Sequence, residues 1–203
     1  MEKAYDVGAT WYEKRSLAAD LSAPWLVLEK YLVEVGANKE FTAIDIGAGP
    51  GVDASVFGQK TKISFFASDL SYPMCKLASK RVVSICSDIA ALGFKNEVFD
   101  LVTCVATLHH APSLVVARNW LSELERITKK GGIIVLSTEL LKNTSPRFED
   151  SPWGPKRWFL PLSQEDLTDM LEVFGLQVKV IQTNQTHRPF ITILATKPFG
   201  CGI

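Results

Sequence analysis

Short apolar runs and helix-patterned segments alternate along this chain from residue 41 to residue 137, and no other feature constrains the fold as strongly. Strands are predicted at 41–46, 63–68, 82–86, 100–106 and 133–137, with helices at 52–59, 71–80 and 113–128. A strand that is followed by a helix and then by another strand favours parallel pairing through a helical crossover. The chain is therefore predicted to be an α/β protein whose sheet carries helices on both faces.

Two segments outside this alternation have patterns of their own. Residues 11–35 carry apolar side chains at helical spacing around Pro24, which predicts two short helices or one interrupted helix. Residues 142–162 are rich in proline and aromatic residues and show no clear period, so an irregular insert is expected there. With 203 residues the chain is long enough for one well-packed domain, and we predict a single domain over 1–203.

The last part of the chain predicts how the sheet is completed. The helix at 113–128 is expected to stop at the glycines of Lys129-Lys-Gly-Gly, after cations in its last turn. Ser163 and Asp166 have the spacing of a capping box and predict a further helix start. No helix separates the last two apolar runs, 177–182 and 191–196, so they should pair as an antiparallel hairpin at one edge of the sheet.

Charge and cysteine usage narrow the function classes. Lysine plus arginine equals aspartate plus glutamate, at 22 each, so the composition gives no general argument for a polyanionic partner such as nucleic acid. The start of the chain lacks the pattern of a secretory signal, and no run of ~18 apolar residues could cross a bilayer. The four cysteines have neither zinc-site nor redox-motif spacing. We expect a cytoplasmic protein with no metal site and no membrane partner.

A glycine-rich turn after the first strand carries the strongest functional signal. Gly47, Gly49 and Gly51 alternate after the buried run, which permits a tight turn and close approach of a ligand to the backbone. A dinucleotide site needs its third glycine one residue later, so this spacing does not fit pyrophosphate binding. Asp45, two residues before the first glycine, would repel a pyrophosphate but suits a ligand that presents an ammonium group.

This turn resembles the first motif of the class I S-adenosylmethionine-dependent methyltransferases, and the resemblance continues down the chain. Asp69 closes the second strand, where a carboxylate can accept hydrogen bonds from ribose hydroxyls. Asp88 matches the acidic position after the third strand, which in the family lies near the adenine. Segments 96–110 and 129–135 look like the fourth and fifth motifs of the methyltransferase-11-like subgroup, and residues 4–12 resemble its aromatic leader.

The resemblance implies a Rossmann-like doubly wound sheet of seven strands, six parallel and one antiparallel at the edge. It also implies S-adenosylmethionine as the methyl donor and S-adenosylhomocysteine as the product. Residues 1–38 would form a helical lid over the cofactor, and the insert at 142–162 would line an acceptor pocket. The expected cofactor contacts are Asp45, Gly47, Ala48, Gly49, Gly51, Asp69, Leu70, Ser87, Asp88, Ile89 and Val105, with Tyr12 and Arg15 from the lid.

The residues that would act on the acceptor are less sharply defined. His109 and His110 are candidates for a general base because histidine titrates near neutral pH, although their motif usually has a structural role. A base is needed only if the acceptor must lose a proton, since alignment of acceptor and methyl donor supplies most of the rate. Trp153 and Trp158, together with His110, could line an acceptor pocket or could simply be packing residues.

The chain is thus expected to be an enzyme that methylates a small-molecule acceptor. The first alternative is a transfer RNA methyltransferase acting at a wobble uridine, because the His109-His110 and Lys130-Gly131 regions resemble such enzymes too. The second is a non-catalytic protein that binds the cofactor and serves as a partner of another protein. A dehydrogenase ranks lower because of the glycine spacing.

Overall fold

The computed structural model describes residues 2–18, 23–36, 40–140, 145–184 and 189–199. Its helices are α1 (Glu2–Leu17), α2 (Ala23–Glu34), α3 (Val52–Thr61), α4 (Tyr72–Ala78), α5 (Leu114–Ile127) and α6 (Gln164–Val173), with short 3₁₀ turns η1 (Ile89–Ala91) and η2 (Leu108–His110). Its strands are β1 (Thr42–Ile46), β2 (Ser64–Asp69), β3 (Val83–Cys86), β4 (Phe99–Val105), β5 (Thr128–Glu139), β6 (Arg147–Ser151), β7 (Gly154–Phe159), β8 (Gln177–Thr183) and β9 (Phe190–Thr196).

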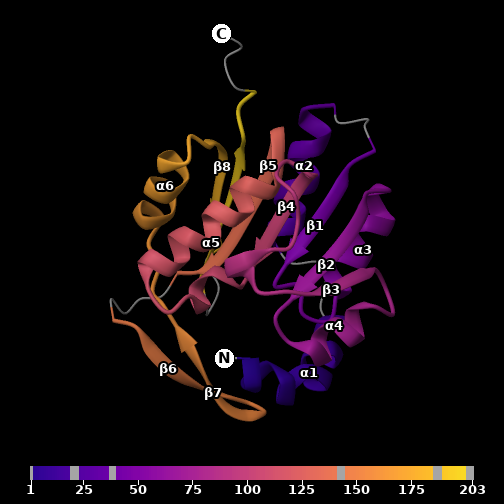
Figure 1. Ribbon diagram of the computed structural model, residues 1–203, viewed down its shortest axis with the longest axis vertical. Helices are drawn as coiled ribbons and strands as arrows, with labels where there is room; N and C mark the ends of the chain where they lie inside the picture. Colours follow the sequence, from indigo (N-terminus) through magenta and orange to yellow (C-terminus); the bar gives the residue numbers. More distant parts are fainter. Residues whose placement is uncertain (1, 19–22, 37–39, 141–144, 185–188, 200–203) are drawn as a thin grey trace.

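Seven of these strands form one sheet in the order β3-β2-β1-β4-β5-β9-β8 (Figure 1). The first five are parallel, and β9 pairs antiparallel with both β5 and β8. The α/β class and the seven-stranded Rossmann-like sheet are confirmed. One detail of the expectation is corrected: the antiparallel strand β9 lies one place inside the edge, because the final hairpin inserts its second strand between β5 and β8.

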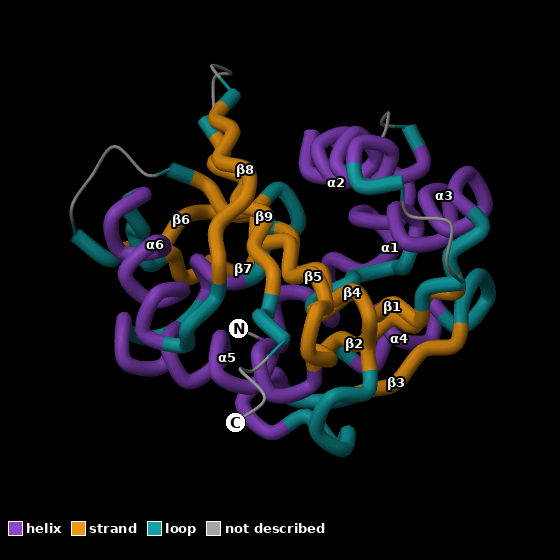
Figure 2. The backbone as a smooth tube through the Cα atoms, turned by 90° about the horizontal axis from the view of Figure 1, so that it is seen from above, coloured by secondary structure: helices purple, strands orange, loops and turns teal. Residues whose placement is uncertain are grey.

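The sheet has two apolar faces because its strands alternate their side chains. Ile44 and Ile46 of β1 belong to a cluster with Leu121 and Leu124 of α5. Ala43, which precedes Ile44 and points to the opposite face, belongs to a second cluster, which includes residues of α2 and α3. Figure 2 shows α2 and α3 on one side of the strands and α5 on the other. The expectation of a sheet with helices on both faces is therefore confirmed.

The N-terminal pattern around Pro24 resolves into two helices, α1 and α2, and Pro24 lies in the first turn of α2, where its missing N–H costs nothing. The segment that joins the helices, 19–22, lies outside the described residues. In the part of the chain that the structure describes, no helix is both long and apolar enough to span a bilayer.

The prediction that Gly131 and Gly132 terminate the 113–128 helix was wrong. The helix ends at Ile127, but Gly131 and Gly132 do not terminate it and instead belong to β5, which starts at Thr128. Lys129 pairs with Asp100 at 2.8 Å, and the Gly131 N–H donates to the Lys197 carbonyl. These contacts hold residues 129–132 beside β4 and the end of β9, as an irregularity in the β4–β5 register.

The irregular insert expected at 142–162 is also corrected. Residues 141–144 lie outside the described residues, but β6 and β7 beyond them form a two-stranded antiparallel sheet. Phe148 and Trp158 face each other across it, with ring centroids 5.1 Å apart. In Figure 1 this hairpin lies next to α1, away from the main sheet. The capped start of α6 is confirmed, because Ser163 and Asp166 form a reciprocal capping box.

Candidate active site

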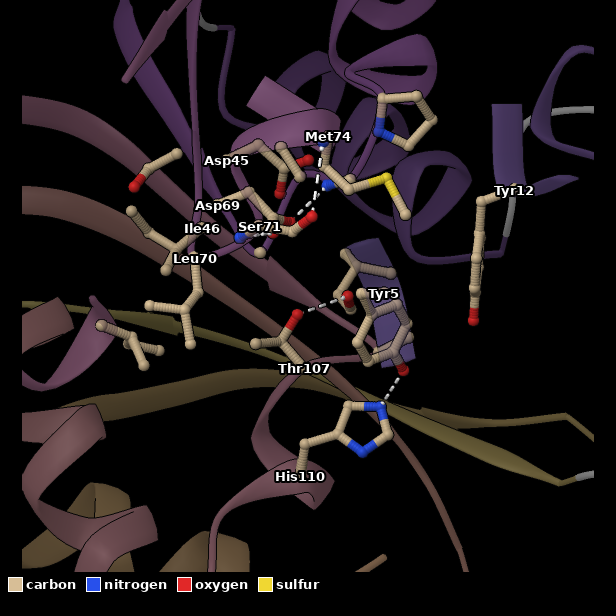
Figure 3. A pocket seen from close by; sticks show the side chains of 18 of the residues that line it. Tyr5, Tyr12, Asp45, Ile46, Asp69, Leu70, Ser71, Met74, Thr107 and His110 are labelled. Carbon is tan, nitrogen blue, oxygen red and sulfur yellow. Dashed lines mark hydrogen bonds between the residues drawn. The ribbon is translucent and has the colours of Figure 1, made fainter. Parts of the chain in front are cut away.

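A pocket opens at the carboxyl ends of β1, β2, β3 and β4, and α1 contributes residues to its rim (Figure 3). This position is the switch point of the sheet, where the strand order turns from β1-β2-β3 towards β4-β5. Four acidic residues line the pocket: Asp45, Asp69 and Asp88, one from each of three neighbouring strand ends, and Asp53 in the first turn of α3. The full apolar and backbone lining adds Ile46, Gly47, Ala48, Gly49, Pro50, Val52, Leu70, Met74, Ile89, Val105, Ala106 and Trp120.

The glycine turn of the pocket contains three glycines, and the space beside the backbone differs at each of them. Gly47 has a φ of 74°, and a Cβ there would lie 2.0 Å from the Thr107 hydroxyl. Gly49 has a φ of 54° and open space beside it, so its backbone is accessible to a ligand. Gly51, also expected in the site, lies outside the lining. It precedes α3 with a φ of 69° and packs against Ala78, which a Cβ would approach to 2.9 Å.

Asp45 lies at the end of β1 and is 4% exposed. Its Oδ1 accepts a 2.7 Å hydrogen bond from the Thr103 hydroxyl on β4. Burial raises the pKa of Asp45 to about 8, with further upward contributions from the charges of Asp53 and Asp69, while Thr103 opposes the shift. A buried carboxyl of this kind ionises readily only when a cation arrives to compensate it.

Asp69 holds the pocket loops together through both of its carboxylate oxygens. The Gly49 N–H donates to Oδ2 at 2.8 Å, and the Ser71 N–H donates to Oδ1 at 2.9 Å. Burial raises the pKa of Asp69, and these backbone donors counteract part of that shift. Each carboxylate oxygen can accept a second hydrogen bond, so the group can still bind hydroxyls of a ligand.

Asp88 is exposed at the mouth of the pocket and follows β3. Its Oδ1 accepts from the Ala90 N–H at 2.8 Å and so caps the η1 turn. Ser87 and Ile89, its neighbours, also line the pocket, as the sequence led us to expect. One carboxylate oxygen of Asp88 is therefore bound to the backbone of the turn, and the other can accept a hydrogen bond from a ligand.

His110 lines the pocket on the side away from Asp45 and Asp69 (Figure 3). Its Nδ1 lies 2.7 Å from the Trp158 carbonyl, which can only accept, so Nδ1 carries the proton. Its Nε2 therefore accepts from the Tyr5 hydroxyl at 2.5 Å. Burial lowers the pKa of His110 to about 4, and the Arg157 charge adds to that shift while the Trp158 carbonyl opposes it. Both ring nitrogens are thus engaged in a neutral imidazole.

His109, the other candidate base, lies outside the pocket lining and is buried behind it. Its Nδ1 accepts from the Glu139 N–H at 3.3 Å and lies 2.8 Å from the Thr138 hydroxyl. Its ring stacks on Phe159 with centroids 5.2 Å apart. These contacts join η2 to the end of β5 and to β7, so the role of His109 is structural.

The lid and insert residues expected in the site divide into two groups. Tyr12 lines the pocket, whereas Arg15 is exposed and its guanidinium lies over the Trp11 ring. Trp153 is not in the lining, and its indole N–H donates to the Ala4 carbonyl of α1 at 2.7 Å. Trp158 is also outside, and its indole N–H donates to the Ala111 carbonyl. The two tryptophans fasten α1 and η2 to the β6–β7 hairpin.

Sequence reasoning missed several lining residues, among them Tyr5, Ser68, Ser71, Met74, Thr107 and Trp120. Ser71 and Met74 follow β2 by two and five residues, so extension of the Asp69 motif by one helical turn would have found them. Trp120 lies mid-helix in α5, where the sequence pattern gives no sign that it faces a pocket.

Comparisons with known proteins agree with this geometry. Residues 44–136 match a family model described as a methyltransferase domain. An uncharacterized protein of Methanocaldococcus jannaschii is 35% identical over 101 residues, which cover 49% of this chain and 41% of that protein. A malonyl-[acyl-carrier protein] O-methyltransferase of Salmonella typhimurium is 29% identical over 139 residues, covering 66% and 51%. A tRNA (carboxymethyluridine(34)-5-O)-methyltransferase of Arabidopsis thaliana is 26% identical over 95 residues, covering 46% and 23%.

The chain therefore spans about half or less of the length of these relatives. Among solved structures, an S-adenosylmethionine-dependent methyltransferase from Clostridium acetobutylicum has a TM-score of 0.75 at 16% identity and covers 96% of this chain and 99% of its own. A Burkholderia thailandensis 1,6-didemethyltoxoflavin-N1-methyltransferase, solved with S-adenosylhomocysteine, has a TM-score of 0.72 at 16% identity, covering 97% and 87%. These likenesses show the fold.

Proposed function

We propose that this chain, which belongs to the class I S-adenosylmethionine-dependent methyltransferases of the methyltransferase-11 type, transfers a methyl group from S-adenosylmethionine to a small-molecule acceptor. The observation that carries the proposal is the convergence of Asp45, Asp69 and Asp88 on one pocket around the Gly47–Gly49 turn. Carboxyl groups at these positions offer no positive charge to a dinucleotide pyrophosphate but suit a ligand that presents an ammonium group and hydroxyls.

Each acidic residue has a proposed partner on the cofactor. Asp45 would face the ammonium group of the methionine moiety, whose charge compensates the buried carboxylate. Asp69 would accept hydrogen bonds from the ribose hydroxyls, and Asp88 with Ile89 would contact the adenine. The 1,6-didemethyltoxoflavin enzyme, which shares the fold, was solved with S-adenosylhomocysteine, and this supports the proposed cofactor.

The molecule is proposed to act as one domain over residues 1–203, with α1 as part of a lid and the β6–β7 hairpin beside the acceptor. Tyr5 and Tyr12 of α1 line the pocket, and Trp153 at the hairpin turn bonds to the Ala4 carbonyl. The acceptor would enter between α1, His110 and the hairpin. The expected cytoplasmic location stays a prediction.

The chain's own residues are proposed to position the reactants and not to react themselves. They would hold the sulfonium methyl and the acceptor in line and keep water away, which supplies much of the acceleration in a displacement of this type. The bound cofactor supplies the electrophilic methyl group. His110 is neutral and has both nitrogens engaged, so it is a poor general base unless Tyr5 moves away.

The test is calorimetric titration with S-adenosylhomocysteine, with NADH as the control ligand. We expect micromolar binding of S-adenosylhomocysteine and no binding of NADH. A folded protein that binds NADH alone, or neither ligand, would contradict the proposed cofactor.

Transfer RNA is the second candidate acceptor, because one curated relative is named as a tRNA methyltransferase. The equal numbers of acidic and basic residues weaken this reading. Salt-dependent binding of transfer RNA, absent for DNA of equal length, would favour it. A non-catalytic cofactor-binding protein is the third reading, and it requires cofactor binding without methylation of any acceptor.

A further inference from the structure

Arg157 on β7 is a buried cation without a counter-charge. The residue is 8% exposed, and no ion pair joins it to any described acidic residue. Its cross-strand neighbour Glu149 pairs instead with Arg147, at 2.6 Å. The Arg157 Nε is fully buried and has no hydrogen-bond partner in the structure. The guanidinium therefore keeps unused donor capacity in a poorly solvated place.

The surroundings of Arg157 connect it to the pocket. Its Nη1 donates to the Tyr12 hydroxyl at 3.3 Å, and Tyr12 lines the pocket. The guanidinium carbon lies 5.1 Å from the ring centroids of both Trp153 and Phe159. On the pocket side Tyr5, which hydrogen-bonds to His110 and whose hydroxyl also interacts with Arg157, completes an aromatic cage (Tyr5, Tyr12, Trp153 and Phe159) that contacts the cation without neutralising it.

Aromatic faces and hydrogen bonds to the neutral hydroxyls of Tyr12 and Tyr5 compensate the buried guanidinium only in part. Cation–π contacts offset only part of the cost of removing an ion from water. Carboxylates satisfy a guanidinium best, because two parallel N–H donors match the two oxygens. A site that holds such a cation beside a binding pocket is suited to an anion that arrives with the ligand.

We infer that the methyl acceptor is a carboxylic acid with an apolar or aromatic body, whose carboxylate binds Arg157 and is methylated on oxygen, an inference that rests on the proposed function. The carboxylate would replace the Tyr12 hydroxyl as the partner of Arg157, and the cage would contact the body of the acid. One carboxylate oxygen attacks the methyl carbon, the C–S bond breaks, and its electron pair passes to sulfur. The products are a methyl ester and neutral S-adenosylhomocysteine.

This acceptor agrees with the state of His110. A carboxylate is already deprotonated at neutral pH, so its methylation releases no proton and needs no base. His110 donates through Nδ1 to the Trp158 carbonyl and accepts through Nε2 from Tyr5, an arrangement that positions the cage and removes no proton. A hydroxyl acceptor, by contrast, must lose a proton as it attacks, and His110 has no ring nitrogen free to take it.

The experiment compares acids with their amides on the protein saturated with S-adenosylhomocysteine. Indole-3-acetate, phenylacetate and malonate are titrated calorimetrically beside indole-3-acetamide, phenylacetamide and malonamide, on the wild type, Arg157→Gln and Arg157→Lys. The matched control is Lys156→Gln, which removes an exposed charge from the same strand. Incubation of the same acids with the methyl donor then tests for a base-labile methyl ester by mass spectrometry.

We expect at least one acid to bind the wild type more than about tenfold more tightly than its amide. Arg157→Gln should abolish this preference, Arg157→Lys should retain part of it, and Lys156→Gln should leave it unchanged. Binding of S-adenosylhomocysteine should stay the same in Lys156→Gln, and all four proteins are compared at saturating S-adenosylhomocysteine. If Arg157→Gln does not fold, the acid-to-amide ratio in the wild type and Arg157→Lys carries the test.

Two results would overturn the inference. One is the absence of any acid preference in a wild-type protein that binds S-adenosylhomocysteine. The other is an acid preference that survives in folded Arg157→Gln. Failure of S-adenosylhomocysteine itself to bind would count against the proposed cofactor instead, so the two failures are distinguishable.

Discussion

At the scale of single residues, the site depends on carboxyl groups whose environments differ. Asp45 is buried and bonds one hydroxyl, Asp69 bonds two backbone N–H groups, and Asp88 is exposed and caps a turn. The same side-chain chemistry is therefore present in an apolar, a preorganised and a solvated setting. These settings lead to separate expectations for substitution and for pH.

Asp69→Asn should weaken S-adenosylhomocysteine binding by more than about tenfold, because a charged acceptor contributes ~1.5–3 kcal/mol per hydrogen bond. Asparagine keeps the size of the side chain and one oxygen that can accept from the Gly49 or Ser71 N–H. Calorimetry measures the change, and the control is Asp150→Asn on the exposed hairpin. An unchanged dissociation constant would remove Asp69 from the site.

Cofactor binding should strengthen as the pH rises from 6 to 8, because Asp45 has a pKa of about 8 and must ionise to attract an ammonium group. The gain is at most about tenfold per pH unit and should be absent in Asp45→Asn.

The effect of Asp45 on the stability of the protein has the opposite sign. The folded-state pKa lies above the unfolded value of about 4, so the contribution of this group to stability is lost as the pH rises from about 4 to 8. Titrations at several pH values, with urea unfolding alongside, check both signs.

At the scale of elements, α1 is held over the pocket by contacts to two other parts of the chain. Asp6 accepts from the Ser71 hydroxyl at 2.6 Å, and Glu13 pairs with Arg81 at 2.8 Å. On the other side, the Trp153 indole packs against Gly8, where a Cβ would lie 2.6 Å from the ring nitrogen. The absence of a side chain at Gly8 thus allows α1 to lie close to the β6–β7 hairpin.

Gly8→Ala should push α1 away from the hairpin and weaken S-adenosylhomocysteine binding several-fold, although alanine favours the helix itself by about 1 kcal/mol. Hydrogen exchange of α1 should become faster while that of the sheet stays unchanged. Gly93→Ala is the matched control, because open space surrounds that glycine. Equal exchange of α1 in both variants would show that the Gly8–Trp153 contact does not hold the lid.

At the scale of the whole molecule, the pocket joins elements that are distant in sequence, from Tyr5 of α1 to Trp120 of α5. A ligand that contacts all of them binds only the folded chain. S-adenosylhomocysteine at 100 times its dissociation constant should add about 2.7 kcal/mol and raise Tm by roughly 5–10 °C. Differential scanning calorimetry checks this shift, and Asp69→Asn at the same ligand concentration should show a clearly smaller one.

The sequence by itself determined the α/β scaffold and the positions along the chain of the acidic residues that line the pocket. The strand–helix alternation predicted the parallel sheet, and the motifs at Asp45, Asp69 and Asp88 predicted three of the pocket's acidic residues. These features are local, because each depends on side-chain period or on a turn of a few residues. Only parallel pairing was needed to bring the strand ends to one edge.

The tertiary structure decided what depends on contacts between distant segments. The β6–β7 hairpin lacks a local period because it packs its aromatic residues against α1 and η2, and Gly131 and Gly132 belong to β5 because the end of β9 lies beside them. The sequence offered His109 and His110 as equivalent candidates, whereas packing buries one behind the pocket and binds the other to Tyr5. Lys156 and Arg157 are neighbouring cations in the sequence, but only Arg157 becomes buried, because the hairpin and α1 pack around it.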